Sequence, residues 1–142
     1  MAAILDDDPG RVAAMRAALA GAGLGGRCAA EFFDDAPAMI AWLEAHLPEC
    51  ALVSLDHDLG PSRRVGDEFR DPGTGRDVAD FLASRAPACP VIVHTSNSLA
   101  RVGMELALQS AGWTVLRVYP QFGADWIGTD WLATVLEALG PP

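Results

Sequence analysis

Ala51-Leu52-Val53-Ser54-Leu55-Asp56-His57-Asp58 is an apolar run that ends in a cluster of polar side chains. Two other segments share this pattern, Ala2-Ala3-Ile4-Leu5-Asp6-Asp7-Asp8 and Val91-Ile92-Val93-His94-Thr95-Ser96-Asn97. Short apolar runs of this kind indicate strands of a parallel sheet that are buried on both faces. Because open α/β sheets bind ligands at the carboxyl ends of their strands, we expect the three polar clusters to meet at one edge.

Amphipathic helices are predicted between these strands. Asp8 can cap a helix that has Pro9 in its first turn and ends in the glycine-rich stretch 21–26. Apolar spacing predicts further helices around 39–47, from Thr74 onward with Asp77 as a capping partner, over 99–111 and around 132–139. The two remaining strands are expected at 28–33 and 114–119.

Five strand–helix units predict an α/β protein in which helices cover both faces of a doubly wound parallel sheet. Right-handed crossovers restrict the possible strand orders, and we expect a single domain over residues 1–142 with the flavodoxin-like order 2-1-3-4-5. This order places the first strand beside the third, so that Asp6, Asp7 and Asp56 come together. The polar segment 60–73 is predicted to be a loop, and loops longer than about 12 residues are usually functional or mobile.

The composition excludes several classes of function. A hydrophobic content of 51% with 20% charged residues is typical of a compact globular chain, and the net charge of −9 argues against binding to DNA or to membrane surfaces. No apolar run reaches the roughly 18 residues of a membrane span, and the apolar start lacks a basic leader. The three cysteines have no zinc or disulfide spacing. We therefore expect a cytoplasmic protein, and its oligomeric state is left open.

The acidic cluster predicts a metal site. Carboxylates gathered at one sheet edge repel one another and resist desolvation, and a cation relieves both effects. Asp6, Asp7 and Asp56 are therefore predicted ligands of Mg²⁺ or Mn²⁺, which prefer oxygen donors. Asp58 lies two residues beyond Asp56 and is a further candidate ligand or general base, with a loop-stabilising acid as the alternative.

Other polar residues of the three segments suit phosphoryl chemistry. His57 and His94 are candidate general acids or bases, because an imidazole titrates near neutral pH, although either can be structural. Thr95 is a candidate donor to a phosphoryl oxygen, and Asn97 is either a ligand contact or a helix cap. Arg76 is a candidate phosphate ligand, with solvation at the surface as the default reading.

Across nearly its whole length the chain resembles a response-regulator receiver domain. The resemblance rests on Ile4-Leu5-Asp6-Asp7-Asp8-Pro9, Leu52-Val53-Ser54-Leu55-Asp56 and Pro90-Val91-Ile92-Val93-His94-Thr95-Ser96. It implies that Asp6, Asp7 and Asp56 hold Mg²⁺ with the backbone carbonyl of Asp58, and that Thr95 contacts a phosphoryl group on Asp56. Receivers carry Lys-Pro after the fifth strand, whereas this chain has Tyr119-Pro120 and no lysine at all.

Three segments are similar to a narrower group, the divergent cyclic-phosphate-processing receivers. They are Ser54-Leu55-Asp56-His57-Asp58-Leu59-Gly60, Thr74-Gly75-Arg76-Asp77-Val78 and His94-Thr95-Ser96-Asn97. This resemblance implies metal-dependent phosphoryl chemistry on a small cyclic or nucleotide-derived phosphate. Two alternatives stay open: a stand-alone receiver that is phosphorylated on Asp56 and signals to a protein partner, and a non-catalytic pseudo-receiver that serves as an interaction module.

Overall fold

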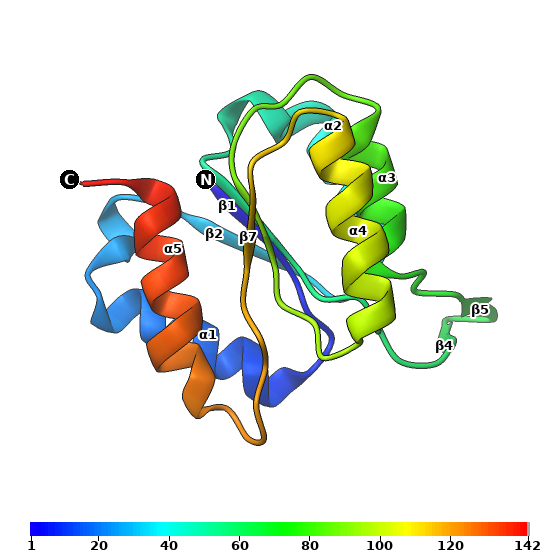
Figure 1. Cartoon of the computed structure of the whole chain (residues 1–142). Helices are drawn as coiled ribbons and strands as arrows, with labels where there is room; N and C mark the ends of the chain where they lie inside the picture. Colours follow the sequence, from blue (N-terminus) through cyan, green and yellow to red (C-terminus); the bar gives the residue numbers. More distant parts are fainter. Residues whose placement is uncertain (142) are drawn as a thin grey trace.

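A parallel five-stranded sheet forms the centre of the molecule (Figure 1). The computed structural model describes residues 1–141, so Pro142, the last residue of the predicted domain, lies outside the described residues. The strands are β1 (Ala2–Leu5), β2 (Ala30–Phe33), β3 (Leu52–Leu55), β4 (Arg63–Val65), β5 (Glu68–Arg70), β6 (Val91–Val93) and β7 (Val115–Arg117). The α-helices are α1 (Pro9–Gly21), α2 (Ala36–His46), α3 (Gly75–Ala83), α4 (Ser98–Ser110) and α5 (Leu132–Leu139).

The predicted parallel sheet is confirmed, but the count of strands differs from the prediction. The sheet order is β2-β1-β3-β6-β7, because a separate antiparallel hairpin, β4–β5, intervenes in the chain between the third and fourth strands of the sheet. The prediction of a loop over residues 60–73 was wrong in this respect. The hairpin was missed because its strands are polar and exposed, so they lack the apolar alternation that marks a half-buried strand.

The hairpin projects from the body of the molecule (Figure 1) and is held at its base by ion pairs. Gly66, with a positive φ of 65°, forms its tight turn. The Arg63 guanidinium donates to both carboxylate oxygens of Asp34 at 2.7 Å and reaches Asp35 at 3.3 Å. Asp35 in turn caps α2 by accepting from the amide of Ala38. These contacts fix the base of the hairpin beside the carboxyl end of β2.

Helices cover both faces of the sheet, as the sequence predicts. Helices α2, α3 and α4 lie on one face and α1 and α5 on the other (Figure 1). The core under the first group is rich in aliphatic side chains, among them Met39, Leu43, Val78, Leu82 and Met104. The core under α1 and α5 contains two large aromatic side chains, Trp126 and Trp131, which are 3% and 0% exposed. A π-helical turn, Ile127–Trp131, leads into α5 and sets the position of Trp131.

The predicted helix signals agree with the structure, while several boundaries shift by one to three residues. Asp8 caps α1 by accepting from the amide of Arg11 at 2.9 Å. The side chain of Asp77 accepts from the amide of Thr74 at the start of α3, as expected for a capping partner. Strand β2 begins at Ala30 rather than Cys28. The amide of Arg27 closes a 3-10 turn on the carbonyl of Leu24, and the amide of Cys28 bonds back to the same carbonyl.

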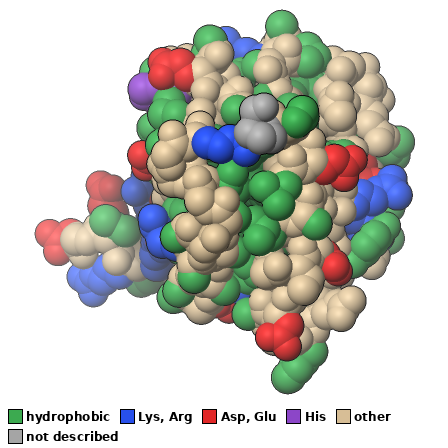
Figure 2. All heavy atoms as spheres, turned by 90° about the vertical axis from the view of Figure 1, so that its left-hand side faces the viewer, with side chains coloured by type: hydrophobic (Ala, Val, Ile, Leu, Met, Phe, Trp, Pro, Cys, Tyr) green, Lys and Arg blue, Asp and Glu red, His purple; other side chains and the backbone are tan. Residues whose placement is uncertain are grey.

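The distribution of charged side chains and the character of the helices are consistent with the acidic, mixed composition of the chain. Figure 2 shows acidic and basic side chains interspersed on one face of the molecule, with no continuous basic patch there. Within the described residues, no helix has both the length and the apolar character required to span a membrane.

Candidate metal and phosphate site

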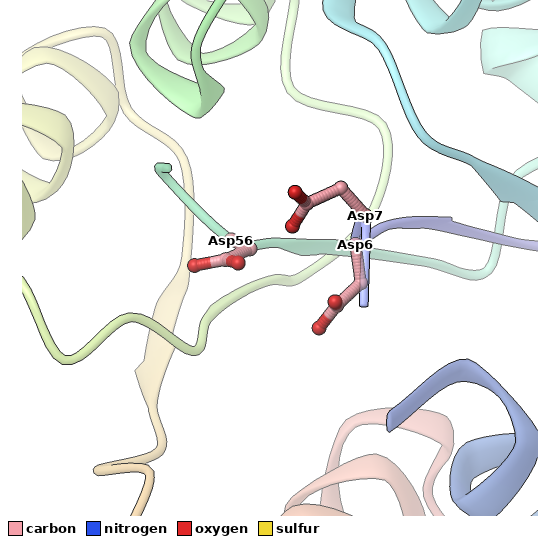
Figure 3. A group of neighbouring side chains, drawn as sticks. All are labelled: Asp6, Asp7 and Asp56. Atoms are coloured by element: carbon pink, nitrogen blue, oxygen red, sulfur yellow. The ribbon is translucent and has the colours of Figure 1, made fainter. Parts of the chain in front are cut away.

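The acidic side chains of two adjacent strands meet at the carboxyl edge of the sheet, as predicted. β1 and β3 pair with Leu5 opposite Leu55, and the amide of Asp56 donates to the carbonyl of Leu5 at 3.0 Å. Asp6, Asp7 and Asp56 therefore leave neighbouring strand ends, and Figure 3 shows their carboxylates gathered around a common space. One oxygen of each lies within 4.8 Å of the others. Asp6 and Asp56 are buried, while Asp7 is half-buried.

Arg11 of α1 contacts all three acids, and the sequence reasoning missed this residue. Its Nη2 lies 2.8 Å from Asp56 Oδ2, 3.0 Å from Asp6 Oδ1 and 3.8 Å from Asp7 Oδ1. Its Nε donates to Asp6 Oδ1 at 3.1 Å. A signal was present in the sequence, because an arginine in the first turn of a helix that follows the acids must lie near the ends of the strands. The prediction of this helix rests on its cap, its proline and its glycine-rich end, and none of these identifies a role for Arg11.

The three carboxylates have unequal electrostatic environments. Burial raises the pKa of Asp6, but the interaction with His94, followed by smaller contributions from the amide of Asp8 and the charge of Arg11, outweighs this effect, and the pKa is lowered overall. Burial and then repulsion by Asp6 raise the pKa of Asp7. Burial, with a smaller contribution from the charge of Asp6, also raises the pKa of Asp56. The single positive charge of Arg11 does not balance the three carboxylates, so the cluster attracts a further cation.

His94 is fully buried within a chain of hydrogen bonds that ends at Asp6. The indole Nε1 of Trp131 donates to Ser54 Oγ at 3.1 Å, Ser54 Oγ lies 2.8 Å from His94 Nδ1, and His94 Nε2 lies 3.2 Å from Asp6 Oδ2. Because Ser54 Oγ accepts from the indole, its own proton is available for Nδ1. Nε2 then carries the ring proton and donates to Asp6. This position favours a role for His94 in holding Asp6, and direct proton transfer by His94 stays a prediction.

Ser54→Ala tests this buried chain. The variant leaves the indole N–H of Trp131 and Nδ1 of His94 without a partner in the core, so we expect the free energy of unfolding to fall by about 1–3 kcal/mol. Urea unfolding followed by tryptophan fluorescence measures the change. Ser84→Ala is the matched control, because Ser84 is exposed and its hydroxyl donates to the carbonyl of Phe81 in its own helix turn. Equal effects of the two substitutions would contradict the assignment.

His57 and Asp58 form a pair directly after Asp56. The amide of His57 donates to Asp56 Oδ1 at 2.7 Å, and the ring Nδ1 of His57 lies 2.8 Å from Asp58 Oδ1. The side chain of Asp58 is 66% exposed and lies outside the group of three acids, so its predicted role as a side-chain ligand gains no support. The structure instead gives Asp58 the contact that orients an imidazole. A role for its backbone carbonyl stays a prediction.

The three predicted phosphate-binding residues lie in different surroundings. Thr95 is buried and its Oγ1 accepts from the amide of Asn97 at 3.1 Å. Asn97 caps α4 by accepting from the amide of Ala100, and its Nδ2 lies 3.5 Å from the Asp58 carboxylate. Arg76 pairs with Asp80 on α3 through its Nε at 2.7 Å. Their roles toward phosphate stay predictions.

The donor set of the acidic cluster fits a divalent cation. Mg²⁺ binds carboxylate oxygens at about 2.0–2.1 Å and keeps several waters, and Mn²⁺ favours similar oxygen ligands. Three carboxylates from two fixed strand ends supply such oxygens after small side-chain rotations. Asp6, Asp7 and Asp56 are therefore the residues that would hold Mg²⁺ or Mn²⁺.

Comparisons with known proteins agree with this architecture. A solved structure described as a response regulator receiver domain from Rhodospirillum rubrum superposes with a TM-score of 0.64 at 15% identity, covering 98% of this chain and 92% of that one. At this level of identity the likeness establishes the fold alone. No curated protein matches the chain. Residues 2–110 match the family model of the cyclic-phosphate processing receiver domain. The chain therefore belongs to the cyclic-phosphate processing receiver family.

Proposed function

We propose that this protein hydrolyses a small cyclic phosphate ester, such as a nucleoside cyclic phosphate, with the help of a divalent cation. The observation that carries the proposal is the placement of the His57–Asp58 pair next to a buried cluster of three carboxylates. The family to which the chain belongs supports the choice of a cyclic phosphate. A bound divalent cation would polarise a phosphoryl oxygen and bring the negatively charged ester to the acids.

We assign the remaining catalytic and positioning roles to residues of the chain. His57 accepts the proton of the attacking water, and the Asp58 carboxylate fixes the tautomer and orientation of the ring. The new bond joins the water oxygen to phosphorus, one ester P–O bond breaks, and the proton returns to the departing oxygen. Thr95 is the proposed hydroxyl donor to a phosphoryl oxygen. His94 holds Asp6 in place through the buried hydrogen bond.

The test is turnover of a panel of nucleoside 2′,3′- and 3′,5′-cyclic phosphates with Mn²⁺ or Mg²⁺, followed by ³¹P NMR. We expect ring opening with wild type and a loss of at least about 100-fold in kcat for Asp56→Asn and for His57→Ala, which remove a cation ligand and the general base. Glu137→Gln removes the same charge from an exposed position near the end of α5 and should retain full activity. No turnover by wild type, or equal activity of wild type and Asp56→Asn, would contradict the proposal.

A second candidate is a receiver that accepts a phosphoryl group on Asp56 and signals to a protein partner. The receiver fold and the position of Asp56 at the end of β3 favour it. Acetyl phosphate or beryllofluoride separates the two functions: a stable adduct on Asp56 supports signalling, whereas catalytic consumption of a cyclic ester supports hydrolysis. A non-catalytic pseudo-receiver would show no affinity for Mg²⁺.

A further inference from the structure

Arg11 occupies the carboxylate oxygens that a divalent cation needs. Asp6 Oδ2 is taken by His94, and Asp56 Oδ1 is taken by the amide of His57. The remaining oxygens of these two buried acids, Asp6 Oδ1 and Asp56 Oδ2, are the ones that the Arg11 guanidinium contacts. A cation that binds both buried acids through Asp6 Oδ1 and Asp56 Oδ2 therefore meets the Arg11 guanidinium at both atoms.

The guanidinium and a divalent cation cannot both sit at these oxygens without strong repulsion. Like charges a few ångströms apart in a partly buried site repel far more than they do in water. The Arg11 side chain is attached to α1 by a flexible stem and is 24% exposed, so it can leave the cluster without movement of the helix. Asp6 and Asp56, by contrast, are fixed at strand ends.

An adjoining cavity of about 480 Å³ can receive the released guanidinium. It lies between the start of α1 and the segment after β7, and Arg11 already lines it together with Asp8, Gly10, Gln121, Phe122, Gly123 and Ala124. The segment is anchored where the indole of Trp126 donates to the carbonyl of Gly123 at 3.0 Å. The chain has no lysine, and Arg117 is engaged with Glu105 at 2.8 Å, whereas Arg11 already contacts the acids at this edge and can therefore face an anion there.

We propose that Arg11 is an exchangeable counter-ion that neutralises the carboxylates in the absence of metal, is displaced by the divalent cation, and then contacts the phosphate of the ligand. The contact with phosphate rests on the proposed function, whereas the exchange with the cation does not. A planar guanidinium suits both tasks, because it binds carboxylate and phosphate with the same paired donors.

Titration calorimetry with Mn²⁺ alone tests the exchange. We expect Arg11→Met to bind Mn²⁺ at least about 10-fold more tightly than wild type, because the competing charge is gone. Arg27→Met removes the same charge at the opposite edge of the sheet and should bind Mn²⁺ like wild type. Unchanged or weaker Mn²⁺ binding by Arg11→Met would overturn the exchange.

Two further measurements complete the test. The first uses wild type, so it does not depend on the folding of a variant, and the second tests the contact with phosphate separately from the exchange with the cation. In ¹⁵N NMR of wild type, the Nε–H signal of Arg11 should shift and broaden on addition of Mg²⁺, and an unchanged signal would overturn the exchange without any variant. Inorganic phosphate titrated into the Mn²⁺-loaded proteins should bind at least about 10-fold more weakly to Arg11→Met than to Arg27→Met; equal binding would overturn the contact with phosphate. Absence of cyclic-ester turnover would remove the proposed function and leave the exchange intact.

Discussion

Gly75→Ala is expected to destabilise the protein by about 3 kcal/mol or more and to abolish binding of the divalent cation. Gly75 is the first residue of α3, and its amide donates to the carbonyl of His57 at 2.9 Å. A Cβ atom built on Gly75 would lie 1.8 Å from the carbonyl oxygen of Asp56 and 3.0 Å from the Cα of His57. These neighbours are backbone atoms, so relief of the clash must move either α3 or the end of β3.

The expected coupling between stability and cation binding follows from this contact. Any displacement of the Asp56 backbone also moves its carboxylate, which completes the cluster with Asp6 and Asp7. Urea unfolding measures the stability, and calorimetry with Mn²⁺ measures the binding. A variant that unfolds at the same urea concentration as wild type and binds Mn²⁺ normally would show that the close approach is not important.

Gly103→Ala is the matched control, because it makes the same substitution in the neighbouring helix. A Cβ at Gly103 would meet Arg76 Nη1 at 2.7 Å, which is the end of a flexible side chain that can rotate away. Alanine is favoured over glycine in a helix interior by up to about 1 kcal/mol. We therefore expect Gly103→Ala to be neutral or stabilising.

The sequence reasoning succeeded where local patterns determine the outcome. The buried strands, the caps at Asp8 and Thr74, and the meeting of Asp6, Asp7 and Asp56 all follow from apolar runs and from the geometry of parallel sheets. The same reasoning could not find the hydrogen bonds from Trp131 through Ser54 to His94. Trp131 and Ser54 are 77 residues apart, and their contact depends on the π-helical turn before α5, for which the sequence carries no clear signal.

The assignment of His94 shows how burial changes the meaning of a motif. From the sequence, a histidine after an apolar strand is a candidate general acid or base. In the structure the ring is 0% exposed, and both of its nitrogens are within hydrogen-bond distance of buried side chains. His57, which is partly exposed and paired with Asp58, is therefore the better candidate for proton transfer. Burial of a single side chain is decided by tertiary packing, which periodicity alone does not reveal.

Asp6→Ala is expected to destabilise the protein strongly and Asp7→Ala is not, although the two aspartates are adjacent. Asp6 accepts from the amide of Asp8, from Arg11 and from His94. Its removal leaves the buried imidazole N–H of His94 without a partner and takes one of two close carboxylates from the half-buried guanidinium of Arg11, which keeps Asp56 at 2.8 Å. We expect a loss of about 3 kcal/mol. Asp7 is half-buried, its Oδ1 lies 3.8 Å from Arg11, and its pKa is raised, so Asp7→Ala should be neutral or slightly stabilising.

Cation binding distinguishes a shared role of the two acids from their unequal contributions to stability. Both variants should lose binding of Mn²⁺ in calorimetry, because each removes one of three ligands. The pH dependence has a definite sign: folding lowers the pKa of Asp6, so its contribution to stability is fully present above the ordinary value of 3.8 and is lost as the pH falls through the lower folded-state pKa. Asp7→Ala with wild-type affinity for Mn²⁺ would show that the third carboxylate is only a solvated acid, and the metal site would then rest on Asp6 and Asp56 alone.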